Sequence, residues 1–339
     1  MKQKVTVADI AERVGLSKSA VAKVLLNNRS TIRVSRENAE KIRKLAEEME
    51  YRPNTAARAL RSGRSGMLGL VLGGLQSPFF SEFAERMLEL ADAQGRRLIV
   101  CPVLWGTERE RAALDSLIRS NVDGILLKTG LFQNAPELAK EYAKYGIPIV
   151  TEGESHPDFS SVSADFRTGM RELFLAIRHQ KIAPPALAAN DHSSSVLEAY
   201  FSCCREFSVE PRLFRFLAYN DPDLDRCAAE ISSAGIRRLL VCSDHYALKL
   251  MSRFGRAGFR IPEDIAIASI GGTIASSYAN PPLTVIDQHI SRLAELQMQE
   301  LLAKLGGDSE IRHLRIPTEL VIRESFPIDK DFKTPPGNR

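Results

Sequence analysis

The sequence predicts an α/β protein that begins with a small all-α head. Two observations support this class: residues 5–50 show three short amphipathic periods, and from Met67 onward short apolar runs alternate with amphipathic stretches. Charge divides the chain in the same way. Residues 1–66 contain 15 Lys and Arg against 7 Asp and Glu, a net charge of +8, whereas the remainder carries −4. A basic head on an acidic body favours a polyanion as the partner of the head.

Composition excludes several classes of protein. A chain of 339 residues that is 44% apolar and 26% charged is typical of a globular protein with two or three domains. No apolar run approaches the roughly 18 residues of a membrane span, and the N-terminus lacks the apolar core of a secretory signal, so we expect a cytoplasmic protein without a membrane partner. Five cysteines without a C-x-x-C pair indicate reduced core thiols, and we expect no metal and no cofactor.

Residues 5–50 fit a helix-turn-helix. Thr6 and Asp9 form an approximate capping box at the first helix, and Gly15 suits a tight turn. The small Ala11 allows two helices to cross closely, and Val21 fills the gap between them. Ser17 and Ser35 are expected to cap the second and third helices.

In a helix-turn-helix the first turn of the second helix meets base edges in the major groove. The side chains expected to be exposed there are Lys18, Ser19, Ala22 and Lys23. Helix N-termini near Thr6 and Ser17 suit phosphate oxygens. The alternative is a helical bundle whose basic face is only solvated.

A short basic segment follows the head. Pro53 blocks continuation of the third helix, and Asn54 can cap a new helix that is too short to be stable alone. Such a helix is a candidate for folding only on DNA.

From Met67 onward the sequence pattern predicts doubly wound parallel sheets, because short buried strands alternate with helices. Strands are expected at 68–72, 97–101, 124–127, 147–150, 186–189, 238–242 and 265–270, and helices at 81–94, 108–119, 136–144, 167–179, 194–206, 224–234, 245–257 and 291–304. Gly69-x-x-x-Gly73-Gly74 lacks the spacing of a dinucleotide loop, and no GxSxG or HExxH occurs. The sequence therefore gives no support to an enzyme.

Residues 6–60 resemble the headpiece and hinge of the lactose-repressor (LacI/GalR) family, in the Tyr51-Arg52-Pro53-Asn54 run followed by Ala57-Arg58 and Leu60. The resemblance continues through Ser77-Pro78-Phe79-Phe80 and the closing motif Pro317 to Ser325. It implies hinge helices that place Leu60 in the minor groove, and two subdomains of the periplasmic-binding-protein type I kind, joined by three crossovers around a ligand cleft. We expect a headpiece at 1–52, a hinge helix and linker at 53–65, an effector-binding and dimerisation domain at 66–326, and a flexible tail at 327–339. Within that domain, the N-subdomain comprises about 66–164 and 291–320, and the C-subdomain about 165–290 and 321–326.

The predicted DNA contacts combine the helix-turn-helix pattern with this resemblance. They are Thr6, Ser17, Lys18, Ser19, Lys23, Asn27, Arg29, Arg33, Asn54, Arg58 and Leu60. The loop after the second helix is about three residues longer than the common form, and its Arg29 and Arg33 are expected to add phosphate contacts.

The predicted effector-binding residues are Ser77, Phe79, Phe80, Trp105, Glu152, Asp191, Val196, Ser243, Asp244 and Gly271. Three of them depart from the family, which has arginine at the position of Val196, asparagine at Ser243 and aspartate at Gly271. Three interpretations stay open. An unusual effector binds, or no small effector binds. Alternatively, the missing groups have been replaced by Trp105, Glu152, Asp191 and His245.

The predicted function is that of a transcriptional regulator, most simply a repressor, which binds a near-palindromic operator as a homodimer because each chain carries one headpiece. A small effector, a carbohydrate or related metabolite, would modulate it. The alternatives are a regulator with a vestigial pocket or with a non-sugar or protein effector and, more remotely, a solute-binding protein or a sugar-converting enzyme with a DNA-binding head.

Overall fold

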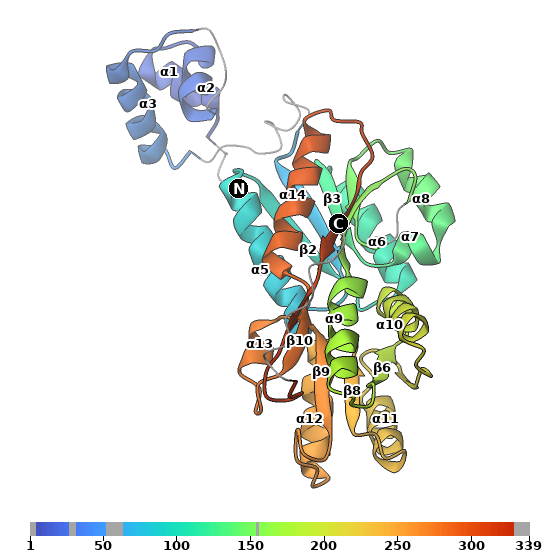
Figure 1. The fold of residues 1–339 in the computed structure, drawn as a ribbon. Helices are drawn as coiled ribbons and strands as arrows, with labels where there is room; N and C mark the ends of the chain where they lie inside the picture. Colours follow the sequence, from blue (N-terminus) through green and yellow to red (C-terminus); the bar gives the residue numbers. More distant parts are fainter. Residues whose placement is uncertain (1–4, 27–31, 52–63, 154–155, 329–339) are drawn as a thin grey trace. The chain divides into compact units, whose positions relative to one another are not determined.

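The computed structural model describes residues 5–26, 32–51, 64–153 and 156–328, which form two compact units, Met1–Ser65 and Gly66–Arg339 (Figure 1). The predicted contacts Asn27, Arg29, Asn54, Arg58 and Leu60 lie outside the described residues, as do most of the hinge segment and the tail.

The first unit is a three-helix head made of α1 (Val7–Val14), α2 (Lys18–Leu26) and α3 (Arg36–Glu48). The predicted capping box is present, since Asp9 N–H donates to Thr6 Oγ1 and Thr6 N–H donates to the Asp9 carboxylate. Gly15 ends α1 in the left-handed conformation, with φ of 71°. A small core holds the helices together, and its fully buried members are Ile10, Val21 and Ile42.

The second unit contains two six-stranded sheets. The strands are β1 (Met67–Leu72), β2 (Arg97–Pro102), β3 (Gly124–Lys128), β4 (Ile149–Thr151), β5 (Ser160–Asp165), β6 (Ala186–Asn190), β7 (Leu213–Phe216), β8 (Arg238–Val241), β9 (Ala266–Gly271), β10 (Thr284–Asp287), β11 (His313–Pro317) and β12 (Glu319–Val321). The first sheet has the order β11-β5-β4-β3-β1-β2 and is parallel throughout. The second has the order β12-β10-β9-β8-β6-β7, and only β12 is antiparallel to its neighbour.

Helices cover both faces of each sheet. They are α5 (Pro78–Ala93), α6 (Thr107–Arg119), α7 (Leu131–Asn134), α8 (Pro136–Ala143), α9 (Phe166–His179), α10 (Ser194–Phe207), α11 (Asp221–Ser233), α12 (Asp244–Arg256), α13 (Ile274–Ser277) and α14 (Ile290–Leu305). On the first sheet α5 and α14, far apart in the sequence, pack side by side (Figure 1). Alternate residues of β1 face opposite sides of the sheet. Leu68, Leu70 and Leu72 belong to the hydrophobic core under α5 and α14, and Val71 belongs to the core under α6 and α8.

The chain passes between the sheets three times, after β5, after β10 and between β11 and β12. Because β12 begins at Glu319 and pairs with β10, residues 319–320 belong to the second sheet, whereas the sequence analysis assigned them to the N-subdomain. Five strands, β5, β7, β10, β11 and β12, were not predicted.

Candidate functional site

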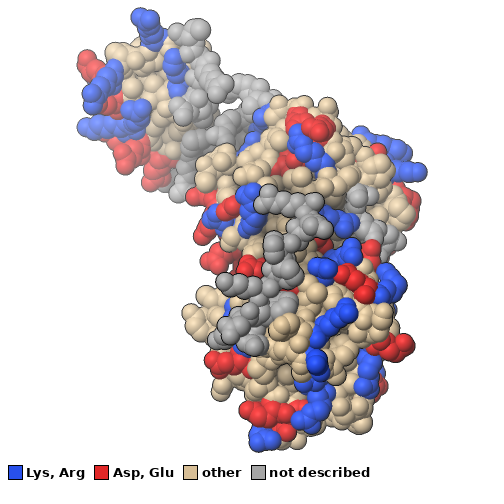
Figure 2. Space-filling view, viewed as in Figure 1, with Lys and Arg blue, Asp and Glu red and all other residues tan. Residues whose placement is uncertain are grey.

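In the head, a turn connects α1 to α2, and the N-terminal end of α2 is exposed. Lys18 and Ser19 in the first turn of α2 are exposed, and the preceding Ser17 accepts a hydrogen bond from Ala20 N–H at 3.2 Å. The expectation that Ala22 is exposed was wrong, because it is only 6% exposed. Lysine and arginine side chains lie on the visible face of the head beside acidic ones (Figure 2).

The remaining described contacts lie around the same helix. Lys23 is half-buried, and its ammonium donates to the carbonyl of Ile32, which ties α2 to the segment before α3. Arg33 is exposed one residue further on. The Thr6 hydroxyl is hydrogen-bonded to Asp9, so the main role of Thr6 is to order the start of α1.

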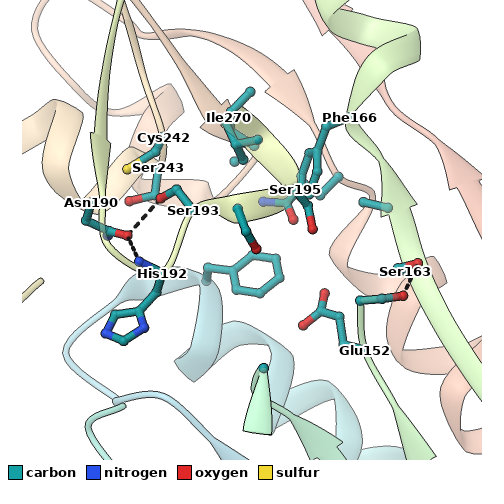
Figure 3. Close-up of a pocket in the computed structure, with 18 of the residues that line it drawn as sticks. Glu152, Ser163, Phe166, Asn190, His192, Ser193, Ser195, Cys242, Ser243 and Ile270 are labelled. Carbon is teal, nitrogen blue, oxygen red and sulfur yellow. Dashed lines mark hydrogen bonds between the residues drawn. The ribbon is translucent and has the colours of Figure 1, made fainter. Parts of the chain in front are cut away.

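A cavity of about 530 Å³ lies in the second unit, at the carboxyl ends of the parallel strands, where ligands bind in open α/β sheets. All ten predicted effector-binding residues line it: Ser77, Phe79, Phe80, Trp105, Glu152, Asp191, Val196, Ser243, Asp244 and Gly271. In Figure 3 Asn190, His192 and Ser193 lie on one side and Glu152 and Ser163 on the other.

Aromatic rings form one end of the cavity. Trp105 contacts Phe80 edge to face at 5.6 Å between ring centroids and stacks on His192 at 4.7 Å with planes 15° apart. Gly73 makes this possible, because a Cβ there would lie 2.6 Å from the indole. The glycines that follow β1 therefore leave space for aromatic side chains rather than for a bound phosphate group.

Asp244 is held from within the protein. It is 2% exposed, and its carboxylate accepts hydrogen bonds from Ser269 Oγ, from Gly272 N–H at 3.0 Å, and from Thr273 N–H and Oγ1 at 2.9 and 2.8 Å. Burial raises the pKa of Asp244, and these four hydrogen bonds oppose that shift. Its main role is therefore to fix the loop after β9. From the sequence, Asp244 was predicted to be an effector-binding residue.

The network of Asp244 also accounts for Gly271. A Cβ at this position would lie 2.1 Å from the Asp244 carboxylate, so a side chain has no room there. The resemblance leads one to expect an aspartate at Gly271, and the packing shows why this chain has none.

Several polar residues that line the cavity were not predicted from the sequence. Lys128 at the end of β3 is 0% exposed, and its ammonium lies 2.5 Å from Glu152. Asn190 accepts hydrogen bonds from His192 N–H and Ser193 Oγ at 2.9 and 2.7 Å. The position of Lys128 just after an apolar run, at a strand's carboxyl end, was the available signal.

An α-helical head with a helix-turn-helix, joined to two parallel-sheet subdomains around a cleft, defines the class of ligand-responsive transcriptional regulators. Three family models match the chain. "Bacterial regulatory proteins, lacI family" covers residues 6–54, "Periplasmic binding proteins and sugar binding domain of LacI family" covers 65–195, and "Periplasmic binding protein-like domain" covers 150–326. The chain belongs to the lacI family of bacterial regulatory proteins, a family of DNA-binding regulators.

Relatives and solved structures agree with this assignment. The HTH-type transcriptional regulator pepR1 of Lactobacillus delbrueckii subsp. lactis is 24% identical over 96% of this chain and 98% of its own length. The ribose operon repressor of Halalkalibacterium halodurans is 26% identical over 94% and 96%. The lac repressor dimer bound to operator and the anti-inducer ONPF has the same fold, with a TM-score of 0.83 and 24% identity over 95% of this chain and 99% of that one.

Proposed function

We propose that this protein is a transcriptional repressor that binds a near-palindromic operator as a homodimer in the cytoplasm. The helix-turn-helix with the exposed Lys18 and Ser19 on α2 carries the proposal. One headpiece per chain requires two chains to recognise two half-sites, and the operator then shares the two-fold symmetry of the dimer. None of the helices in the described ranges combines the length and apolarity that crossing a membrane requires.

The cleft supports regulation by a small ligand. A ligand that touches both walls binds two arrangements of the subdomains with different affinity, and this difference shifts the equilibrium between them. Sugars suit the family context, since relatives include the ribose operon repressor of H. halodurans and a structural neighbour is described as the transcriptional regulator CelR–cellobiose complex. The resemblance further supports Asn54, Arg58 and Leu60 as hinge contacts that couple the cleft to DNA.

Selection of bound sequences from a random DNA pool tests the proposal. The wild-type protein is expected to recover a palindrome. Lys18→Ala is expected to relax particular base positions, with a loss of about 1–3 kcal/mol for each base contact removed. Lys140→Ala, at an exposed position of α8, is the matched control and should recover the wild-type palindrome. Recovery of no preferred sequence at low and moderate salt would refute operator recognition.

A further inference from the structure

Trp105 reaches across the cleft to the second sheet. It follows β2, and its indole stacks on the imidazole of His192, which follows β6, with ring centroids 4.7 Å apart. The indole also shares a hydrogen bond with the hydroxyl of Tyr219, which follows β7. Trp105 therefore uses one face of its ring and its single N–H donor on partners in the opposite subdomain.

Two glycines allow the loops of the two subdomains to approach this closely. A Cβ at Gly73 would lie 2.6 Å from the indole of Trp105, and a Cβ at Gly74 would lie 2.8 Å from the hydroxyl oxygen of Tyr219. Neither glycine has a positive φ, so the reason for glycine at these positions is space rather than backbone conformation. The missing side chains leave the room that Trp105 and Tyr219 occupy.

The backbone beside these rings is held in an uncommon conformation. Leu104, Trp105 and Tyr219 have φ values of 50°, 59° and 56°, in the left-handed region that residues other than glycine rarely adopt. Leu104 N–H donates to the Gly73 carbonyl at 2.6 Å, and Tyr219 N–H donates to the Tyr246 hydroxyl at 3.0 Å. Such conformations persist only where the surroundings impose them, and they are typical of clamps and switch regions.

We propose that Trp105, His192 and Tyr219 form a latch that holds the two subdomains together at this end of the cleft and controls access to the cavity. All three side chains line that cavity. The ring stack and the hydrogen bond both join the two subdomains, so an open arrangement loses both contacts at once.

The latch adds regulation to the cleft, and it rests on the proposed role of the cleft as an effector site. Its new element is that aromatic side chains of the chain itself set the equilibrium between closed and open arrangements, which a ligand then shifts. Variants that weaken the latch should therefore open the cavity in the absence of any ligand.

Cys242 offers a probe of opening that needs neither ligand nor DNA. Its thiol lines the cavity, is 7% exposed, and lies on the same side as Asn190 and His192 (Figure 3). The rate at which N-ethylmaleimide alkylates Cys242 in the full chain, measured by mass spectrometry, reports how often the cavity opens. Cys227 is 0% exposed and is not part of the lining, so its alkylation reports unfolding instead.

Gly74→Ala is the decisive variant, because it adds atoms and leaves no hole through which the reagent could enter. The new methyl group displaces the Tyr219 hydroxyl, and the labelling rate of Cys242 should rise about fivefold or more because the open arrangement becomes more populated. Tyr219→Phe removes only the hydroxyl and should raise the same rate about threefold, through the lost hydrogen bond. The rate at Cys227 should stay unchanged in both variants.

Matched controls carry the same chemical changes elsewhere. Gly255→Ala adds a methyl group with nothing within 4 Å of it, and Tyr145→Phe removes a hydroxyl from an exposed ring. Both should keep the wild-type labelling rate of Cys242.

The fluorescence of Trp105 provides a second measure of opening, since the chain has a single tryptophan. Opening exposes the indole, so the acrylamide quenching constant should rise in Gly74→Ala and in Tyr219→Phe together with the labelling rate of Cys242. The controls Gly255→Ala and Tyr145→Phe should match the wild type.

Three results would overturn the latch. Cys242 labelling may stay at the wild-type rate in both latch variants. Cys227 labelling may rise in parallel, which would show that the contacts serve stability. The quenching constant may stay unchanged while Cys242 labelling rises, which would place the opening elsewhere. DNA selection with the wild-type protein runs in parallel: failure to recover any operator would reject the proposed function, whereas the labelling results reject the latch alone.

Discussion

At the scale of single residues, Asp244 and Gly271 constrain one another. Four donors converge on the Asp244 carboxylate, and the space that a side chain at position 271 would need is occupied by that carboxylate. A buried carboxylate with its hydrogen bonds satisfied orders the loop after β9, and this loop forms part of the cavity wall.

This coupling predicts a non-additive pair of substitutions. Gly271→Ala should lower the free energy of unfolding by about 2 kcal/mol through overpacking, and Asp244→Ala by about 3 kcal/mol through unsatisfied donors. The double variant should lose at least about 1 kcal/mol less than the sum, because removing the carboxylate makes room for the new methyl group. Urea unfolding measures all three.

Gly255→Ala is the control for these variants, since Gly255 lies within α12 with nothing within 4 Å of an added Cβ. It should leave stability unchanged or raise it by up to about 1 kcal/mol. Additive effects in the double variant, or a Gly271→Ala protein as stable as the wild type, would show that the two positions are independent.

The sequence predicted the membership of the cavity better than the roles of its residues. The sheet topology places residues at strand ends, such as Glu152 and Ser243, at the cavity. The alternation of strands and helices along the sequence is enough to predict this topology. The hydrogen bonds that the Asp244 carboxylate accepts and the burial of Lys128 depend on groups 24 or more residues away in the sequence, such as Ser269 and Glu152. Local pattern does not encode such contacts.

At the scale of elements, the segment before α3 is tied to α2. Lys23 donates to the Ile32 carbonyl, and the exposed Arg33 follows directly. This arrangement places the positive charge of Arg33 next to the residue that Lys23, in the last turn of α2, contacts.

Arg33 is therefore expected to contact a phosphate. Arg33→Gln should flatten the slope of log affinity against log salt concentration by about one, because one fewer counterion is released on binding. Fluorescence anisotropy with the selected operator, titrated over a range of KCl concentrations, measures the slope. Lys140→Gln in α8 should keep the wild-type slope, and an unchanged slope in Arg33→Gln would exclude the contact.

The strands that the sequence did not reveal share physical causes. β5 reads Ser-Ser-Val-Ser-Ala-Asp, which lacks an apolar run, although its first five residues are buried between β4 and β11. β7 and β12 are short edge strands, and β12 is half-exposed. Their pairing comes from neighbours supplied by the rest of the chain rather than from their own propensity.

At the scale of the whole molecule, groups from the two sheets meet across the cleft. Trp105 follows β2 and stacks on His192, which follows β6. On α5, Glu82 accepts a hydrogen bond at 2.9 Å from the backbone N–H of Ile274 in α13. Both contacts would have to change for the subdomains to move relative to one another, as the proposed regulation requires.

Trp105 is the single tryptophan of the chain, so its fluorescence reports on this contact. Burial lowers the pKa of His192 from 6.5, so the imidazole stays neutral at pH 7 and gains a proton only below pH 6.5. Because a protonated imidazole quenches indole emission strongly, the emission should fall on acidification with a midpoint below pH 6.5. His192→Phe should abolish the transition, and a transition that survives in that variant would place its origin elsewhere.

The most direct test of the account is the thermodynamic coupling between the cleft and DNA. Operator affinity of the full chain is measured with and without the hexose that stabilises it best, and hexose affinity is measured with and without operator. If the cleft regulates DNA binding, each ligand changes the affinity for the other by the same factor, about fivefold or more. Hexose binding that leaves operator affinity unchanged would contradict the account and identify an operator-binding protein whose pocket no longer regulates it.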